Sequence, residues 1–305
     1  MDKAYADTVR LLLAVAPYVF VGDAFAMKGG TAINLFVRDM PRLSVDIDVV
    51  YTRWRVPREQ ALAAIAAELA AISARLMRAG LSVRTVPTRG MGDTKLLIDD
   101  DKSQVKVEVN VVFRGTALPT ERRSLRQKPA EMFSAELEAP VLAVDELYGS
   151  KLVAAMDRQH PRDLFDVWQA FEAGGLSDDA IECFVTYLAG HNRPTHEVLF
   201  PNPKDIDVEY RGTFVGMTTD PVSLDTLLAV RTRLLGELPQ RLTADQRRFL
   251  IGLARAEPEW TLLRCPHAAE LPALQWKLAN LRTFKKRRPE DFDRQAADLE
   301  ARLGA

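Results

Sequence analysis

Two short stretches near the amino terminus decide the fold: KGGT at residues 28–31 and SVDIDVVY at residues 44–51. The second stretch alternates in polarity and is rich in β-branched residues, which is typical of a half-buried strand. Residues two apart in a strand point to the same side, so Asp46 and Asp48 present two carboxylates on one face. The glycine pair of the first stretch predicts a tight turn that opens a helix, where backbone N–H groups favour phosphate. A phosphate-binding turn beside two acidic side chains is therefore expected.

A third carboxylate comes from a later strand pattern, VKVEVNV at residues 105–111. Its valines form one buried face, so Glu108 lies on the opposite face. If this strand pairs with that of Asp46 and Asp48, three carboxylates converge. Mg²⁺ or Mn²⁺ suits such oxygen ligands, and two ions would hold the attacking hydroxyl and the leaving pyrophosphate of an NTP. Glu108 is also placed to accept the proton of that hydroxyl.

Single motifs of this kind are weak evidence, and the chain contains its own comparison. DID recurs at residues 205–207 without a preceding Gly-Gly turn, and we interpret that copy as loop surface. GSK at residues 149–151 is not a P-loop, because the earlier glycine is absent and Leu152 follows the lysine. The ordered set of turn, helix, acidic strand and later acidic strand is much more specific than any part of it.

Composition indicates a soluble globular protein. The 305 residues are 47% hydrophobic and 27% charged, with a net charge of −1. Cys183 and Cys265 lie too far apart for a C-x-x-C pair, which argues against structural zinc or a disulfide framework. The apolar stretch at residues 11–27 is broken by Pro17 and Asp23 and is shorter than a membrane span. We therefore expect a cytoplasmic protein with no membrane partner.

The pattern of elements changes along the chain, which predicts an α+β fold. Helix and strand signals mix up to about residue 135, and helices dominate afterwards. We predict an α/β domain at residues 1–135 and a mostly helical domain at residues 136–305. Residues 191–221 are expected to form a long irregular connection. Helices are expected at residues 5–15, 57–80, 145–156, 162–174, 224–235, 244–254 and 273–284, and strands at 44–51, 81–86, 95–98 and 105–113.

These motifs resemble the AbiEii/AbiGii toxin family of the DNA polymerase β-like nucleotidyltransferase superfamily. The resemblance covers about residues 20–175. The matching segments are KGGTAINLF at residues 28–36, Arg42, Ser44, DID at 46–48, DELYGSK at 145–151 and RDLFDV at 162–167. The superfamily usually has Gly-Ser at the turn, whereas Thr31 follows Gly30 here and keeps a hydroxyl for phosphate.

The resemblance implies a polymerase β-like core with a small mixed sheet and a toxin of a type IV toxin–antitoxin system, neutralised by a cognate antitoxin. It also implies that the domain at residues 1–135 is the nucleotidyltransferase domain and that the domain at residues 136–305 completes the NTP site and binds the acceptor. Members that resemble the mycobacterial MenT toxins transfer a nucleotide from NTP to the 3′ acceptor end of tRNA, which would block translation. By position, the roles implied are metal binding for Asp46, Asp48 and Glu108, phosphate binding for Gly29, Gly30, Thr31 and Ser44, triphosphate contact for Lys151 and support of the nucleotide site for Asp163.

The residues alone leave other functions open. The same transfer could use a hydroxyl of a small molecule or a protein as acceptor, and near-neutral net charge suits that alternative. A non-enzymatic module that binds NTP or a partner protein is the other alternative. Basic runs at residues 122–128 and 285–288 are either solvated surface or phosphate contacts for the acceptor stem of tRNA.

Overall fold

The computed structural model describes residues 3–88 and 92–304, which form two compact units. Unit 1 ends at Val144 and also includes Phe214–Pro221. Unit 2 consists of Asp145–Thr213 and the chain from Val222 onwards. The domain border expected between residues 135 and 136 stays a prediction, and the return of eight residues to unit 1 was not expected from the sequence.

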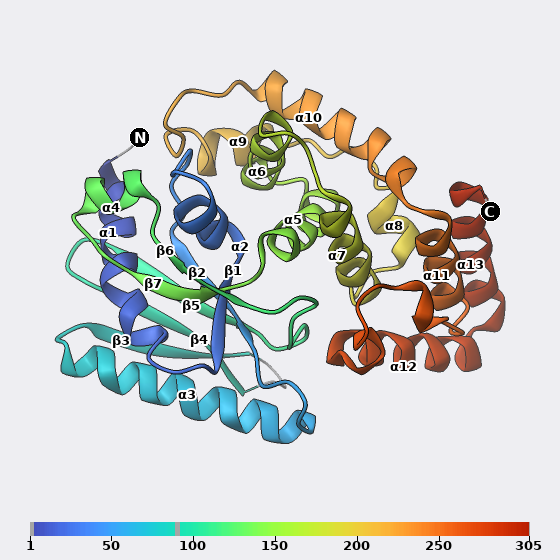
Figure 1. The fold of residues 1–305 in the computed structure, drawn as a ribbon, viewed down its shortest axis with the longest axis horizontal. Helices are drawn as coiled ribbons and strands as arrows, with labels where there is room; N and C mark the ends of the chain where they lie inside the picture. The colour runs from blue at the N-terminus through green and yellow to red at the C-terminus, as the bar shows by residue number, and fades with distance from the viewer. Residues whose placement is uncertain (1–2, 89–91, 305) are drawn as a thin grey trace. The chain divides into compact units, whose positions relative to one another are not determined.

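Unit 1 is built on one mixed sheet, with the acidic strand at its centre (Figure 1). β2 (Asp46–Tyr51) pairs antiparallel with β1 (Phe25–Lys28) and parallel with β5 (Gln104–Asn110). The order is β3-β4-β5-β2-β1-β7-β6. The other strands described are β3 (Ser82–Thr88), β4 (Gly92–Asp99), β6 (Glu121–Ser124) and β7 (Glu138–Val141).

The two faces of the central strands differ in chemistry. Ile47, Val49, Val107 and Val109 are buried, whereas the alternating positions between them are half-buried and polar. Two helices, α1 (Lys3–Val19) and α3 (Arg58–Arg78), pack on the sheet (Figure 1). The period-two pattern thus leaves the carboxylates on the face that does not enter the core.

α3 is the one helix in residues 3–88 and 92–304 that is long and apolar enough to cross a membrane by length and composition. Its buried residues recur every three or four positions, from Ala61 and Ile65 to Leu69, Ile72 and Leu76. The helix also contacts β3, β4 and α1. This one-sided burial is that of a helix packed on a sheet.

The glycine pair joins β1 to a short helical segment. β1 leads into α2 (Gly29–Thr31) and then into a π-helical turn at Ala32–Val37, whose first five residues are buried. A second short helix, α4 (Gln127–Phe133), lies near α1, where the Arg10 guanidinium is 5.8 Å from the Phe133 ring centroid. A helix follows the turn as expected, but it is wound more loosely than an α-helix and is buried on nearly all sides instead of being amphipathic.

Residues 214–221 hold the segment that precedes the acidic strand. The Leu43 N–H donates to the Met217 carbonyl at 2.8 Å, and the Thr219 N–H donates to the Pro41 carbonyl at 2.9 Å. An isolated antiparallel bridge joins Arg42 to Thr218. A distant part of the sequence thus fixes the backbone that leads into Asp46.

The regular elements in the described residues of unit 2 are all helices, joined by loops, as expected for the second half of the chain. The expected irregular connection at 191–221 is wrong in part: it contains two short helices, and Asp207 begins one of them instead of lying in a loop. Helices of five and seven residues are too short to show a helical period. The α-helices are α5 (Val144–Arg158), α6 (Pro161–Glu172), α7 (Asp178–Ala189), α8 (Thr195–Leu199), α9 (Asp207–Thr213), α10 (Leu224–Glu237), α11 (Ala244–Ala254), α12 (Pro272–Arg287) and α13 (Pro289–Leu303).

Close packing of α5 against α7 predicts the effect of one substitution. A Cβ on Gly149 would lie 2.5 Å from the Cys183 Cβ and 2.6 Å from the Phe184 nitrogen. We expect Gly149→Ala to lower the free energy of unfolding by about 1–3 kcal/mol because a buried contact is overpacked. Gly236 in α10 is the control, since a Cβ there meets nothing within 4 Å. Gly236→Ala should raise stability by roughly 0.5–1 kcal/mol, and an equal loss in both variants in urea unfolding would contradict the packing argument.

Candidate functional site

The acidic pair lies on the polar face of β2, as the period-two pattern predicted. Asp46 and Asp48 are both half-buried. The strand that carries Glu108 is the parallel neighbour of β2, with Asp48 opposite Glu108 and Asp46 opposite Lys106. The structure therefore places all three predicted acids on one face of two adjacent strands.

The glycine turn closes directly on one of these carboxylates. Gly29 has φ of +74°, and a Cβ there would lie 2.7 Å from Asp48 Oδ2. A Cβ on Gly30 would lie 2.6 Å from Arg42 Nη2 and 3.1 Å from Ser44 Oγ. Glycine is favoured at both positions. Gly29 has a positive φ that other residues rarely adopt, and at both Gly29 and Gly30 a Cβ would come too close to neighbouring side chains. A ligand held by this turn would therefore sit next to Asp48.

Hydroxyl groups tie the turn to the acidic strand. Thr31 is buried, and its Oγ1 lies 2.9 Å from Ser44 Oγ. The same hydroxyl hydrogen-bonds the backbone carbonyl of Asp46. Thr31 and Ser44, both predicted to contact phosphate, are thus part of the framework that positions Asp46.

The charges of the site are only partly compensated. Burial, and then repulsion by Asp46, raise the pKa of Asp48. Burial alone would also raise the pKa of Glu108, but hydrogen bonds from Lys95 and Lys106 outweigh it and lower that pKa. The Glu108 oxygens lie 2.8 Å from Lys95 Nζ and 2.9 Å from Lys106 Nζ. The charge of Glu108 is therefore neutralised by two lysines. At Asp48, burial and the repulsion from Asp46 prevail.

This donor set bears on the expected metal site. In the described part of the chain, no group of three or more His, Cys, Asp and Glu side chains is arranged to hold a metal ion. Asp46 and Asp48 fit a hard divalent cation, because a cation would relieve the repulsion that raises the pKa of Asp48. Glu108 as the third ligand stays a prediction, since its carboxylate is bound by two ammonium groups.

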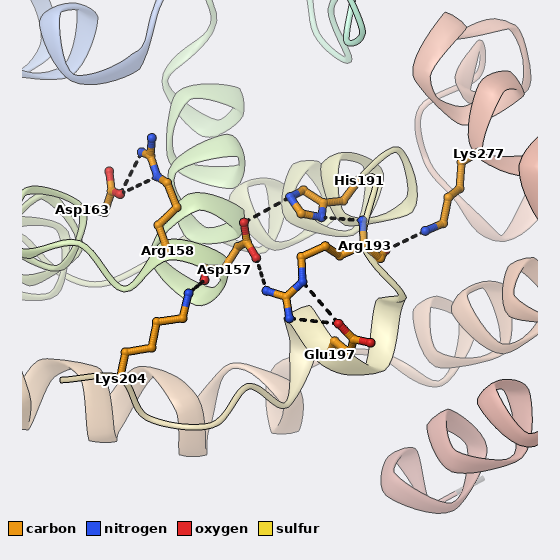
Figure 2. Close-up of polar contacts among 8 residues, drawn as sticks. All are labelled: Asp157, Arg158, Asp163, His191, Arg193, Glu197, Lys204 and Lys277. Atoms are coloured by element: carbon orange, nitrogen blue, oxygen red, sulfur yellow. Dashed lines mark hydrogen bonds and ion pairs between the residues drawn. The ribbon is translucent and has the colours of Figure 1, made fainter. Parts of the chain in front are cut away.

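Unit 2 brings together the other predicted residues. Lys151 on α5 is buried, and its Nζ lies 2.8 Å from Asp163 Oδ1 and 2.9 Å from Asp166 Oδ2 on α6. Arg158 binds the other oxygen of Asp163 at 2.8 Å (Figure 2). Burial alone would raise the pKa of Asp163, but Lys151 and Arg158 hold it well below its usual range. Lys151 is therefore an oriented cation and not a mobile surface lysine.

Three partners of these residues were missed or left undecided by sequence reasoning. Lys95 stands opposite Glu108 across the β4–β5 pair, which no local pattern indicates. Arg158, at the end of α5, gave no signal either. Asp166 follows Asp163 by three residues, a spacing that puts both on one helix face and was the available clue.

Comparison with known proteins identifies the family of the chain. The family model described as "Nucleotidyl transferase AbiEii toxin, Type IV TA system" matches residues 10–280. No curated protein matches the chain by sequence.

Among solved structures, the chain is similar to MenT4, a nucleotidyltransferase toxin from Mycobacterium tuberculosis H37Rv. The identity is 21%, the TM-score is 0.59, and the match covers 92% of this chain and 94% of that chain, so it shows the fold. A second match is the complex of CdnC with HORMA-deltaN from E. coli MS115-1, with 12% identity, 90% and 87% coverage and a TM-score of 0.22. Because the family model spans most of its length, the chain belongs to the AbiEii nucleotidyltransferase toxins of type IV toxin–antitoxin systems.

Proposed function

We propose that this toxin transfers a nucleoside monophosphate from NTP to the 3′ acceptor end of tRNA in the cytoplasm, and so blocks translation until its cognate antitoxin neutralises it. The observation that carries the proposal is the contact between the glycine turn and the acidic strand. A Cβ on Gly29 would lie 2.7 Å from Asp48 Oδ2, so backbone suited to phosphate adjoins a carboxylate suited to a cation.

In this proposal Asp46 and Asp48 hold Mg²⁺ or Mn²⁺, with Glu108 as the third acid. When bound, the cation supplies charge neutralisation and Lewis acidity at the phosphoryl group. The N–H groups of the Gly29–Gly30 turn orient the triphosphate, and the hydroxyls of Thr31 and Ser44 keep the turn in register with Asp46. Glu108 accepts the proton of the attacking hydroxyl after release from Lys95 or Lys106.

Unit 2 contributes a second charged group. We assign Lys151 to contact with the triphosphate and Asp163 to support of the nucleotide site. Asp163 and Asp166 fix the Lys151 ammonium at 2.8 and 2.9 Å, which orients its charge before the substrate arrives. A preoriented cation stabilises the charge that develops on the phosphoryl oxygens without further rearrangement.

Recognition of tRNA would rest on cations that the protein leaves unpaired. In the first basic run Arg122 and Arg123 are ion-paired with Glu138 and Glu121, whereas Arg126 and Lys128 make no ion pair with any residue in the described ranges. In the second run, Lys286 and Arg287 at the end of α12 have no acidic partner among residues 3–88 and 92–304. These two residues, which are exposed and adjacent in sequence, are candidates for phosphate contact, as is the exposed Arg126 of the first run.

The first prediction concerns the acidic pair. Asp48→Ala is expected to abolish nucleotidyl transfer, because a lost ligand removes several kcal/mol of transition-state stabilisation. The measurement is the incorporation of label from each α-³²P-NTP into total tRNA with Mg²⁺. Asp205→Ala is the matched control, since this acid belongs to the second DID copy in unit 2, and it should leave the incorporation unchanged.

The same assay decides between acceptors. Label in tRNA with wild type and with Asp205→Ala, but not with Asp48→Ala, supports the proposal. Full transfer by Asp48→Ala would refute the metal assignment. If the label enters protein or small molecules instead of tRNA, the acceptor is not tRNA but a molecule of that class. If the protein binds NTP but transfers nothing to any acceptor, the non-enzymatic module is favoured.

The second prediction concerns the buried ion pairs of unit 2. Asp163→Asn should lower the free energy of unfolding by about 3 kcal/mol at pH 7, because it leaves the buried Lys151 with one carboxylate. The pKa of Asp163 is lower in the folded protein than in the unfolded chain, where it is roughly 3.9. The ionised Asp163 therefore stabilises the folded state at pH values above that unfolded pKa, and this stabilisation is lost as the pH falls below it.

Urea unfolding from pH 7 down to pH 3 tests this. The gap between wild type and Asp163→Asn should be widest at pH 7 and should narrow below about pH 4. Asp245→Asn, at a side chain that is 63% exposed, is the control and should change stability by less than about 0.5 kcal/mol. A gap that stays constant with pH would show that Asp163 does not act through its charge.

The third prediction concerns tRNA binding. Replacing Lys286 and Arg287 together by Gln should reduce the dependence of log affinity on log salt by about 1–2, because each lost phosphate contact accounts for roughly 0.7–0.9. Arg122→Gln is the control and should have a smaller effect, since its guanidinium is already paired with Glu138. Filter binding at several salt concentrations measures the slopes, and an unchanged slope in the double variant would remove these residues from the interface.

A further inference from the structure

Unit 2 contains a pocket of about 200 Å³, and none of the residues assigned above to nucleotide transfer lines it. One face of α12 lines it, with Lys277, Asn280, Leu281 and Phe284 at positions i, i+3, i+4 and i+7. Gln295 and Leu299 line it from α13, and Asn192, Thr195 and His196 from the start of α8 and the residues before it.

A buried cation at the pocket lacks a counter-charge. Lys277 is 5% exposed, and its Nζ donates to the Arg193 carbonyl at 2.6 Å (Figure 2). An ammonium has three donors, and Lys277 makes no ion pair with any residue that the structure describes. The acids nearby, Asp157 and Glu197, are both bound by the Arg193 guanidinium. The charge of Lys277 is therefore available to an anion.

Electrostatics agrees with this description. Burial lowers the pKa of Lys277 to about 8, although Glu197 acts in the opposite direction. A buried charge without a counter-charge lowers the stability of the fold. The ammonium of Lys277 is already removed from water, so an anion that enters the pocket would form a strong charge-assisted hydrogen bond with it. The alternative, a purely structural lysine, would be expected to have an acid in contact, as Lys151 has.

Three side-chain amides at the pocket are also without partners. The side-chain amides of Asn192 and Asn280, which are exposed residues, and of the half-buried Gln295 make no hydrogen bond to another residue within 3–88 and 92–304. Each amide offers donors and an acceptor together. Leu281, Phe284 and Leu299 provide apolar surface in the same lining. One cation, paired donors and acceptors, and a flat apolar surface thus share one cavity.

We propose that this pocket binds a single nucleotide unit, with its phosphate on Lys277, its base edge on the amides of Asn192, Asn280 and Gln295, and its ring against Leu281 and Phe284. A heterocyclic base uses both the donors and the acceptors of amides, whereas a simple aliphatic acid would leave the acceptors unused. The pocket is smaller than the roughly 300–1,000 Å³ that enclose a whole drug-sized ligand, so part of the nucleotide stays outside. Either a free nucleotide or one residue of an RNA chain meets this description.

The experiment measures binding with the full chain in an Asp48→Ala background and without divalent cations, so that the Gly29–Asp48 site and transfer do not contribute. The probes are the four nucleoside 5′-monophosphates, a single-stranded trinucleotide RNA and inorganic phosphate, titrated by calorimetry. Adding Lys277→Met should weaken binding of the nucleotides at least tenfold, or about 1.4 kcal/mol. This variant removes a buried charge, so its unfolding midpoint should not fall.

Arg282→Met is the matched control, because Arg282 is an exposed cation on the same helix outside the pocket. Its binding should equal that of the parent. Equal affinity with and without Lys277, or an equal loss with Arg282→Met, overturns the proposal. Phosphate that binds as tightly as the nucleotides also overturns it, because the base would then contribute nothing. Tighter binding of the trinucleotide assigns the site to RNA, and tighter binding of a mononucleotide assigns it to a free nucleotide.

Discussion

The constraint on which unit 1 depends is the repulsion between two carboxylates that share one face of a central strand. Asp46 and Asp48 cannot leave that face, because Ile47 and Val49 between and beyond them are fully buried. The glycine turn brings backbone close to Asp48. Lys28, opposite Asp48 in the β1–β2 pair, and Lys106 offset its charge only in part, since the pKa of Asp48 stays raised. Unit 1 therefore has negative charge that is only partly compensated, next to backbone N–H groups suited to phosphate. A ligand that carries both a cation and a phosphate group would match this arrangement.

The charged side chains of the two units differ in how far their charges are compensated. In unit 2, Lys151 lies between Asp163 and Asp166, and Arg158 covers the outer oxygen of Asp163. That cluster is complete without a ligand, and breaking it leaves an uncompensated charge. The acidic pair of unit 1 is incomplete without one. The charges of the first cluster are balanced by residues of unit 2 itself, whereas the acidic pair leaves negative charge that a bound cation can balance.

Local patterns in the sequence were sufficient for the central elements. Period-two alternation identified β2 and β5, the glycine pair identified the turn, and Pro57 with the alanine-rich run identified α3. Elements fixed by long-range packing were missed, among them β6, α7 and α13. The partners of Glu108 belong to the same class, because Lys95 reaches it only through the register of β4 against β5. The spacing of residues along the sequence does not reveal which residues face each other across two paired strands.

Lys151 and Lys277 are both buried in unit 2, and the difference between them is the strongest argument for a second ligand. Lys151 has two carboxylates in contact. Lys277 has one backbone carbonyl, and burial depresses its pKa to about 8. A structural role would be served as well by methionine or leucine, which fill similar space without the cost of desolvating an ammonium. A complementary anion bound in the pocket would offset this cost, and the amides of Asn192, Asn280 and Gln295 in the lining offer further donors and acceptors to such a ligand.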